Sequence, residues 1–380
     1  MRLLLLAAAV AAAAAGIVWA LLRSRNMHLW IASYLAQWPR RRRKRDGAVT
    51  THVYFCFCDH YEPYWRKADT ATARRRVQHW LDAYPRVASA HRDSDGQPPR
   101  HSFFYPEEEY DEQILDGLAD LCRAGYGDIE VHLHHDNDTA ANMSATLQRY
   151  TRLLHERHGM LRRDPATGQI LYAFIHGNWA LDNSRPDGRW CGVDNELKVL
   201  ADTGCRVDRT MPSAPSETQT QKINSIYFAR GCAGQRKAHD HGRDARVGEW
   251  VQGSDELLLV QGPLALNWRD RKLGVLPRIE SSEISADALP TADRVALWER
   301  SAIAVVGAEQ HLFIKVHTHG AEERTAEALL EGGLDRLWTE LERRYRDQPG
   351  YALHYVSAWQ LYEKVQALCK PNEAPAKAAS

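Results

Sequence analysis

Short apolar runs alternate with amphipathic helical stretches along most of this chain, and this alternation limits the folds that it can adopt. The run His52–Cys58 is rich in β-branched and aromatic residues and is typical of a buried strand. Similar runs follow at 128–134, 169–175 and 312–316, and Thr139–His158 has a helical pattern. Strands that alternate with helices favour a parallel sheet, closed or open, so the sequence predicts an α/β fold.

Four of the predicted strands end in histidine or carboxylate residues. These endings are Asp59-His60-Tyr61-Glu62, His132-Leu133-His134-His135-Asp136-Asn137-Asp138, His176-Gly177-Asn178-Trp179 and His317-Thr318-His319-Gly320. A lone histidine at a strand end is more often a core or loop residue than a ligand. Four such endings are a different matter, because the carboxyl ends of parallel strands converge on one face, where sites are built. We therefore predict a polar site at that face.

The second of these endings has a spacing that suits a metal ion. His132 and His134 are two residues apart, so both side chains lie on one face of the strand. His134 and Asp138 could also converge if the chain turns into a helix between them. Asp59 is the natural carboxylate partner, and His60 and Glu62 are candidates for a proton-accepting base. The predicted ligands of one divalent ion are thus Asp59, His132, His134 and Asp138.

Other residues at the same face are candidates for substrate binding. They are His176, Asn178, Trp179, His319 and, on the segment MPSAPSE, Glu217. That segment is either a substrate loop or a proline-rich connector. Gly177 and Gly320 would permit tight turns or a close approach of a ligand to the backbone. The 12 tryptophans and 15 tyrosines suit a carbohydrate cleft, although such side chains fill cores just as often.

The N-terminus predicts a membrane anchor. Leu3–Leu22 carries no charge and has about the 20 residues that a bilayer-spanning helix needs. We expect residues 1–25 to form an uncleaved single-pass anchor; a signal peptide cleaved near Ala11–Ala15 is the alternative. Basic residues follow the apolar stretch, notably the run Arg40–Arg45. By the positive-inside rule, the rest of the chain faces the cytoplasm.

Residues 26–50 form the predicted basic juxtamembrane segment. Trp30 and Tyr34 recur there at helical spacing, which favours either an interfacial helix or, in the plainer interpretation, a disordered basic linker. The last residues, 370–380, are rich in alanine, lysine and proline and are predicted to be disordered. The oligomeric state cannot be read from the sequence.

Charge and cysteine content exclude some classes of function. Lysine plus arginine and aspartate plus glutamate both number 49, so the net charge offers no case for nucleic-acid binding. The 7 cysteines lack the paired CxxC spacing of a structural zinc site, and we expect most of them to be small buried residues.

The order of these motifs resembles the glycoside hydrolase/deacetylase superfamily. An Asp that ends the first strand, the EVHLHH segment and a late KVHTHG are together most similar to polysaccharide deacetylases. The resemblance implies a distorted (β/α) barrel of about seven strands over residues 51–369. It also implies zinc or a similar divalent ion, held by one Asp and two His.

Within the resemblance, Asp59 matches the metal-binding Asp of an Asp-Asp pair, and Cys58 stands where that family has its base. His134 matches the first His of the second motif, whose other position is Asp138 here. His317 is similar in place to the histidine that protonates the leaving group. The implied activity is metal-dependent removal of acetyl groups from a polysaccharide or amino-sugar conjugate, with Glu62, His60 or Asp138 as the base.

Three other functions remain open from the sequence. One is a metallophosphoesterase-like hydrolase with two metals, which Asp59-His60, Gly177-Asn178 and His317-Thr318-His319 faintly resemble. Another is a glycosidase that uses two carboxylates among Glu62, Asp182 and Glu217. The last is a non-catalytic member of the same fold that binds glycans or holds a membrane assembly together.

Overall fold

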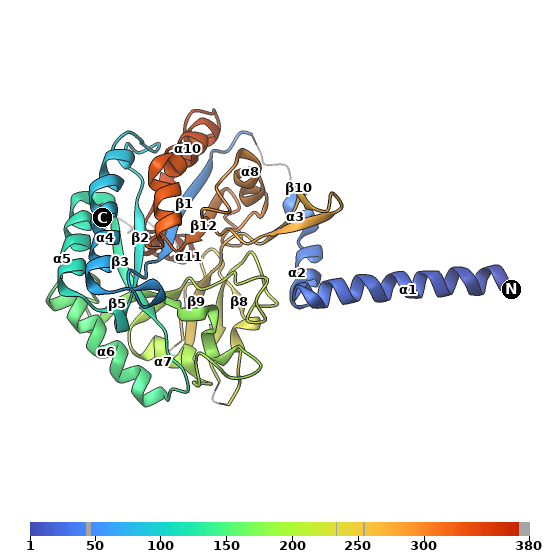
Figure 1. Ribbon diagram of the computed structural model, residues 1–380, viewed down its shortest axis with the longest axis horizontal. Coiled ribbons are helices and arrows are strands. Elements are labelled where there is room, and N and C mark those ends of the chain that lie inside the picture. The colour runs from blue at the N-terminus through green and yellow to red at the C-terminus, as the bar shows by residue number, and fades with distance from the viewer. Residues whose placement is uncertain (43–46, 233, 254, 372–380) are drawn as a thin grey trace, which may run out of the picture.

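The computed structural model describes residues 1–42, 47–232, 234–253 and 255–371 of the 380. Within these ranges the main sheet has 11 strands in the order β12-β1-β2-β3-β5-β6-β9-β7-β8, with β13 beside β1 and β4 beside β5 (Figure 1). Its strands are β1 Thr51–His60, β2 His101–Pro106, β3 Gly127–Leu133, β4 Arg162–Arg163, β5 Ile170–His176, β6 Cys205–Asp208, β7 Ile226–Arg230, β8 Arg243–Asp244, β9 Glu256–Val260, β12 His311–Thr318 and β13 Tyr351–Tyr355. A separate hairpin pairs β10 Ala265–Lys272 with β11 Leu276–Glu280.

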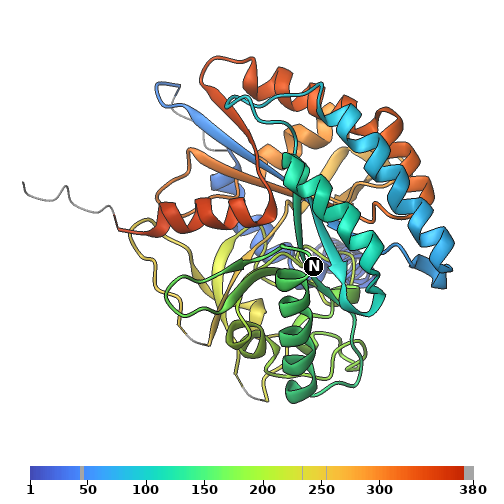
Figure 2. The same ribbon diagram turned by 90° about the vertical axis from the view of Figure 1, so that its left-hand side faces the viewer.

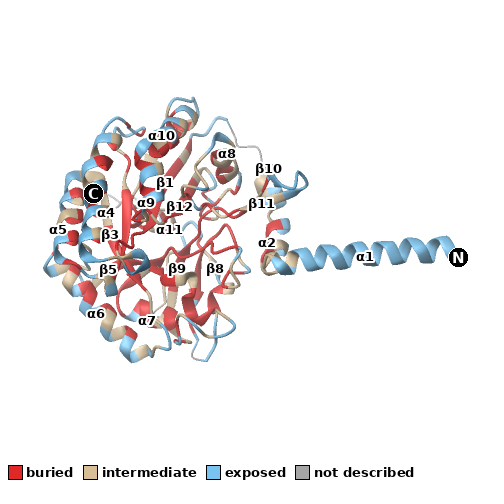
Figure 3. Cartoon of the chain, viewed as in Figure 1, coloured by how far each residue is buried: buried red, intermediate tan, exposed pale blue. Residues whose placement is uncertain are grey.

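The sheet is mostly parallel, as the alternation of strands and helices predicts. The α-helices are α1 Arg2–Ser24, α2 Ile31–Ala36, α3 Trp38–Arg42, α4 Thr70–Ala88, α5 Glu112–Leu121, α6 Ala140–Glu156, α7 Glu196–Asp202, α8 Ala292–Arg300, α9 Glu323–Ala328, α10 Leu334–Leu341 and α11 Ala358–Cys369. Figure 2 shows α4, α5 and α6, coloured from blue to green, lying across the sheet. Figure 3 shows the strands buried beneath helices whose outer faces are exposed. The α/β prediction is therefore confirmed.

Strand β1 lies at the centre of this arrangement. It pairs in parallel with β12 over nearly its whole length, from His52 opposite His311 to Asp59 opposite Thr318. On its other edge β13 pairs with the first half of β1 and β2 with its end. Because β1 has neighbours on both edges and is buried on both faces, its carboxyl end is held rigidly.

Side chains of β1 alternate between two cores, because successive residues of a strand point to opposite faces. Phe55 and Phe57 belong to the outer core, with Trp80 of α4. Tyr54 and Cys58 belong to the inner core, which α11 closes near the amino ends of the strands. The alternation therefore sends Asp59 to the outer face and His60 to the inner one.

The sheet is strongly curved, but a closed barrel is not shown. In the described part of the chain, no strand ladder joins β12 to β8. Isolated bridges, Arg246 with Val306 and Glu283 with His317, lie at this gap. The ammonium of Lys315 also donates to the carbonyl of Met211 across 3.1 Å. Loop segments thus occupy the place where a (β/α) barrel would have its closing strands.

The N-terminal helix α1 extends away from the body, and none of its residues is buried (Figure 1). By length and composition alone, it is apolar enough to cross a membrane, a test that a signal sequence also passes. The expected side of the membrane has no support in the structure.

The segment after α1 docks on the body. Trp30 is fully buried and Tyr34 nearly so, in a small core with Ile223 and Leu264. The Gln37 amide donates to the carbonyl of Ile223 over 2.7 Å. These contacts fit neither a disordered linker nor a helix lying free at a bilayer surface. The predicted basic run beyond residue 42, and nearly all of the predicted disordered tail, lie outside the described residues.

Candidate functional site

The carboxyl ends of β1, β3 and β12 bring several of the predicted polar side chains together. The rings of His60 and His319 are 4.8 Å apart between centroids, and those of His60 and His132 are 5.1 Å apart. His132 and His134 are similarly close, at 4.6 Å. We call the group His60, Glu62, His132, His134 and His319 the cavity cluster.

Glu62 is the centre of the cavity cluster. Its Oε1 lies 3.2 Å from Nε2 of His132 and 3.5 Å from Nε2 of His134. On the far side of its ring, His132 donates from Nδ1 to the carbonyl of Ile175 over 2.8 Å. That bond fixes the ring and points Nε2 at the carboxylate, which is the way protein histidines are oriented toward metals.

A cavity of about 350 Å³ lies in front of this cluster. Its lining includes His60, Glu62, His134, Asn178, Trp179, His319 and Trp65, with charged residues such as Arg66, Asp287 and Arg324 around them. Asn178 and Trp179 both have positive φ, 52° and 54°, in the short 3-10 turn that follows β5. Non-glycine residues adopt this conformation mainly where the surroundings impose it, which is common at functional sites.

Burial and neighbouring charges separate the protonation states of the cluster. Burial, with the adjacent rings of His319 and His132, holds the pKa of His60 well below its usual value. Burial alone would raise the pKa of Glu62, but its hydrogen bond to His132 and the nearby histidines outweigh burial and lower it. For His134, burial lowers the pKa, yet the hydrogen bond to Glu108 and the charge of Glu62 leave it raised. Neutral and charged groups thus stand side by side at the cavity.

Two glycines, Gly177 and Gly320, allow the strand ends to approach so closely. A Cβ on Gly177 would lie 2.3 Å from Cδ2 of His134. A Cβ on Gly320 would lie 2.1 Å from Oδ2 of Asp59. In both cases protein side chains, rather than a ligand, come near the backbone.

Asp59 does not join the cavity cluster. Its Oδ2 lies 2.8 Å from Nε2 of His101, and its Oδ1 accepts from the backbone N–H of Gly320 over 2.7 Å. The carboxylate is fully buried on the outer face of the sheet. The expected convergence of Asp59 with His132 and His134 is therefore not found, because Asp59 and His60 point to opposite faces of β1.

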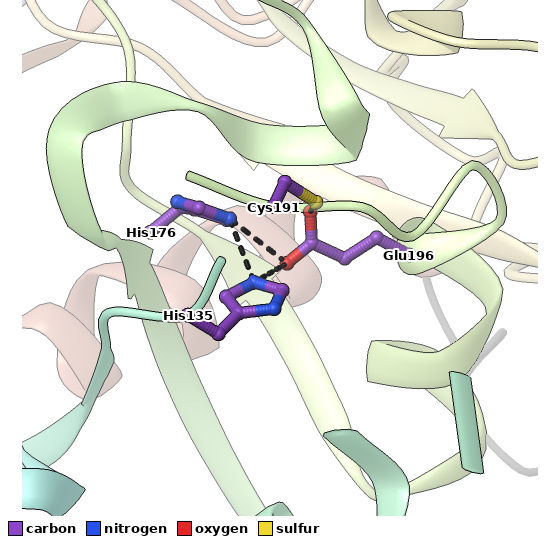
Figure 4. Close-up of side chains that lie close together, drawn as sticks. All are labelled: His135, His176, Cys191 and Glu196. Atoms are coloured by element: carbon purple, nitrogen blue, oxygen red, sulfur yellow. Dashed lines mark hydrogen bonds and ion pairs between the residues drawn. The ribbon is translucent and has the colours of Figure 1, made fainter. Parts of the chain in front are cut away.

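Asp138 and His176 lie in a different place. Asp138 contacts Nδ1 of His135, not His134, at 3.1 Å. His176 is fully buried and belongs with His135, Cys191 and Glu196 in a second cluster (Figure 4). Burial lowers the pKa of His176 to about 4. His176 is thus not placed to contact a substrate in the cavity.

The other predicted residues divide in the same way. His317 is buried behind His60, with 5.9 Å between the ring centroids, and does not line the cavity. Glu217 forms an ion pair with Arg185 at 2.8 Å, away from the cavity. Asp182 is buried, and its carboxylate accepts from the N–H of Ala238. A two-carboxylate glycosidase requires two of these carboxylates in one cleft, and Glu62, Asp182 and Glu217 do not share one.

The cavity cluster has the donors of a metal site. Two overlapping groups could hold an ion, Glu62 with His132 and His134, and Glu62 with His60 and His319. His60 supports this use of the cluster, because its Nε2 is buried and has no hydrogen-bond partner among the described residues. Two imidazoles and one carboxylate are a common ligand set for a catalytic divalent ion.

Sequence reasoning missed two residues of this site. Glu108 orients His134 through a hydrogen bond of 2.5 Å to Nδ1, and Trp65 lines the cavity. Glu108 could have been predicted from the sequence, because the run Glu107-Glu108-Glu109 follows β2 and is a fifth strand ending with polar residues.

Comparison with known proteins gives the chain no family. No family model matches it, and neither does any curated protein. Among solved structures, it is similar to an alpha-mannosidase from Enterococcus faecalis V583, at 10% sequence identity and a TM-score of 0.40. The match covers 85% of this chain but only 30% of the mannosidase.

Proposed function

We propose that the protein is a metal-dependent hydrolase that acts on a carbohydrate held in the cavity. The observation that carries the proposal is the position of the cavity cluster: Glu62, His132 and His134 converge on one point beside an open cavity. Catalytic sites keep such an open position, whereas structural metal sites are closed by protein ligands. A bound divalent ion would polarise the scissile carbonyl and acidify water.

The chain's own residues supply binding and proton transfer. His60 is neutral near pH 7, and its Nε2, which has no partner in the described ranges, can accept a proton or a hydrogen bond at the cavity. His319 lines the cavity, so it replaces the buried His317 as the group placed to contact the leaving oxygen or nitrogen. Trp65 and Trp179 offer apolar ring surface for a sugar, and the indole N–H of Trp179 has no partner among the described residues.

The finer assignment is hydrolysis of an acetyl group on a polysaccharide or amino-sugar conjugate, by zinc or a similar ion. Its support is the resemblance of the strand-end motifs to polysaccharide deacetylases. In this proposal α1 holds the enzyme at a membrane, with the body on the cytoplasmic side by the charge of the flanking residues. Lining residues of opposite charge, such as Arg324 and Glu322, suit a polar substrate.

The test uses the full chain in detergent, with bound metals measured by mass spectrometry and acetate release measured on acetylated oligosaccharides. Glu62→Gln should abolish the divalent ion of the cavity and lower kcat by about 100-fold or more. The matched control is Glu340→Gln, a partly buried carboxylate of α10 that pairs with Arg343, and it should leave metal content and kcat unchanged.

Two outcomes would overturn the proposal. One is a Glu62→Gln protein that keeps its metal content and its activity. The other is a wild-type protein that binds oligosaccharide but takes up no ion at the cavity, which would favour the non-catalytic glycan-binding function. A third outcome, two cavity ions per chain together with hydrolysis of a phosphate ester and no acetate release, would favour the phosphoesterase.

A further inference from the structure

A second group of potential ligands lies behind the cavity, and the proposed function makes no use of it. We call His135, His176, Cys191 and Glu196 the buried tetrad (Figure 4). His135 follows β3, His176 ends β5, and Glu196 begins α7, with Cys191 in the loop before it. His176, Cys191 and Glu196 are 0% exposed, and the side chain of His135 is 6% exposed.

The atoms of the tetrad face one another at the spacing of metal ligands. Nε2 of His135 lies 2.9 Å from Nε2 of His176 and 3.3 Å from Oε1 of Glu196. Nε2 of His176 is 3.4 Å from the same Oε1. A tetrahedron with bonds of about 2.0–2.1 Å has edges of roughly 3.3 Å, so this triangle has the dimensions of one zinc face.

Cys191 supplies the fourth donor. Its Sγ is 3.4 Å from Oε2 of Glu196, and one ligand atom from each of the four residues lies within 4.8 Å of the others. Figure 4 shows the sulfur on the side of the carboxylate away from His135. Two nitrogens, one oxygen and one sulfur form a donor set that zinc accepts readily.

Each histidine of the tetrad is already engaged through its other nitrogen. Nδ1 of His135 contacts Oδ2 of Asp138 at 3.1 Å, and Nδ1 of His176 donates to the carbonyl of Gly177 over 2.5 Å. A neutral ring that donates from Nδ1 carries a lone pair on Nε2. Two such lone pairs and a carboxylate oxygen then meet at about 3 Å, an arrangement that a shared cation stabilises.

Backbone contacts close the loop around this point. The N–H of Asp138 donates to the carbonyl of Cys191 over 2.9 Å, and the N–H of Asp182 donates to Oε2 of Glu196 over 2.5 Å. Gly192 has a φ of +97°, and a Cβ there would lie 2.6 Å from the N of Asp138. Only glycine lets the cysteine loop lie this close to the histidine loop.

We propose that the buried tetrad is a structural zinc site, separate from the cavity, in which His135, His176, Cys191 and Glu196 are the four ligands. Four protein ligands and burial on all sides are the marks of a closed, structural site. The ion ties the ends of β3 and β5 to the start of α7. It thereby fixes the side of the cavity that carries His134 and Trp179. The proposal goes beyond the proposed function and does not depend on it.

Sulfur ligation gives a test that the cavity cannot imitate, since the cavity cluster contains no cysteine. The full-length wild-type protein, loaded with zinc, is measured by X-ray absorption, and a cobalt-loaded sample is measured by optical absorption. We expect one Zn–S distance of about 2.3 Å and a thiolate-to-cobalt charge-transfer band. Cys191→Ser should lose the band and about one zinc per chain, whereas the control Cys232→Ser, which removes an exposed thiol, should keep both.

The wild-type spectra keep the proposal falsifiable even if Cys191→Ser fails to fold. A zinc-loaded wild type with no sulfur ligand, or a cobalt band retained in Cys191→Ser, overturns the inference. The two proposals also fail separately. A wild-type protein that releases acetate but shows no sulfur ligand would rule out only the zinc site at the tetrad. A protein that has a sulfur-ligated zinc but is inactive would rule out only the hydrolase.

Discussion

The cavity cluster and the buried tetrad share the end of one strand but differ in what surrounds them. His134 and His135 are neighbours in the sequence, and successive side chains point in opposite directions, so one lies at the cavity and the other in the tetrad. In the cavity cluster Glu62 and His134 line an open cavity together with Trp65 and Trp179, whereas His132 is fully buried. In the tetrad four side chains face one another, with backbone N–H groups behind them. If both proposals hold, exposure, more than residue type, distinguishes the reactive centre from the structural one.

Chelation should separate the two centres by rate, and we expect this to be the largest effect. An ion at the cavity can be reached directly, whereas the tetrad must open first. If that opening requires about 3 kcal/mol, the tetrad ion leaves roughly 100-fold more slowly. The measurement is metal content against time after addition of a chelator to the full chain. Equal rates of metal loss would show that the chelator reaches both centres equally well. A low concentration of urea favours local opening, so it should bring the two rates closer together.

Asp59→Asn tests whether the carboxylate is a ligand or part of the scaffold. The buried Asp59 contacts His101 and the N–H of Gly320. Removing its charge leaves His101 with a poorer partner, so the free energy of unfolding should fall by about 3 kcal/mol. Metal content in both centres should stay unchanged, as checked by urea unfolding and mass spectrometry. A folded Asp59→Asn protein without cavity metal would restore Asp59 as a ligand.

Trp179→Ala should weaken substrate binding at the cavity without affecting the tetrad. Loss of the ring surface should raise KM about 10-fold, equivalent to about 1.4 kcal/mol, with metal content and kcat little changed. Trp190→Ala is the matched control, because Trp190 packs under Arg185 outside the cavity. Equal effects of the two substitutions on KM would contradict the placement of substrate beside Trp179.

The smallest expected effect is a change with pH in the contribution of Glu109, beside the cavity, to the free energy of unfolding. Burial, with the charges of Glu62 and Glu108, raises the pKa of Glu109 from 4.5 to about 7. Between these values the folded state binds more protons than the unfolded state, so the contribution of Glu109 to stability falls as pH rises. Because the side chain is partly exposed, the change should be about 1 kcal/mol.

Glu109→Gln should remove that decrease, as measured by urea unfolding at pH 5 and pH 8. The amide oxygen can still accept from the N–H of Tyr64, so the local fold is kept. Glu340→Gln should retain the wild-type pH dependence. A Glu109→Gln protein with the same dependence as the wild type would show that the carboxyl titrates elsewhere.

Sequence reasoning located the cavity because parallel strands bring their carboxyl ends to one edge. Glu62, Asn178 and His319 could be placed there from position alone. The direction of Asp59 could not, since β1 is buried on both faces and shows no alternation between polar and apolar residues. The tetrad was also missed: Cys191 and Glu196 reach His135 through the irregular segment 177–195, whose path no periodicity encodes.

The docking of the segment after α1 limits how far the body can move relative to α1. The amide of Asn26 already donates to the carbonyl of Pro215 over 2.9 Å, and Trp30 is buried, so no free tether separates α1 from the body. If α1 crosses a membrane, as proposed, a body attached to it in this way would not swing out into solution. Its cavity would stay at a fixed distance from the bilayer, and it would meet a substrate by diffusion in the plane of the membrane. Molecules held at that height would be reached, and longer chains only where they pass through it.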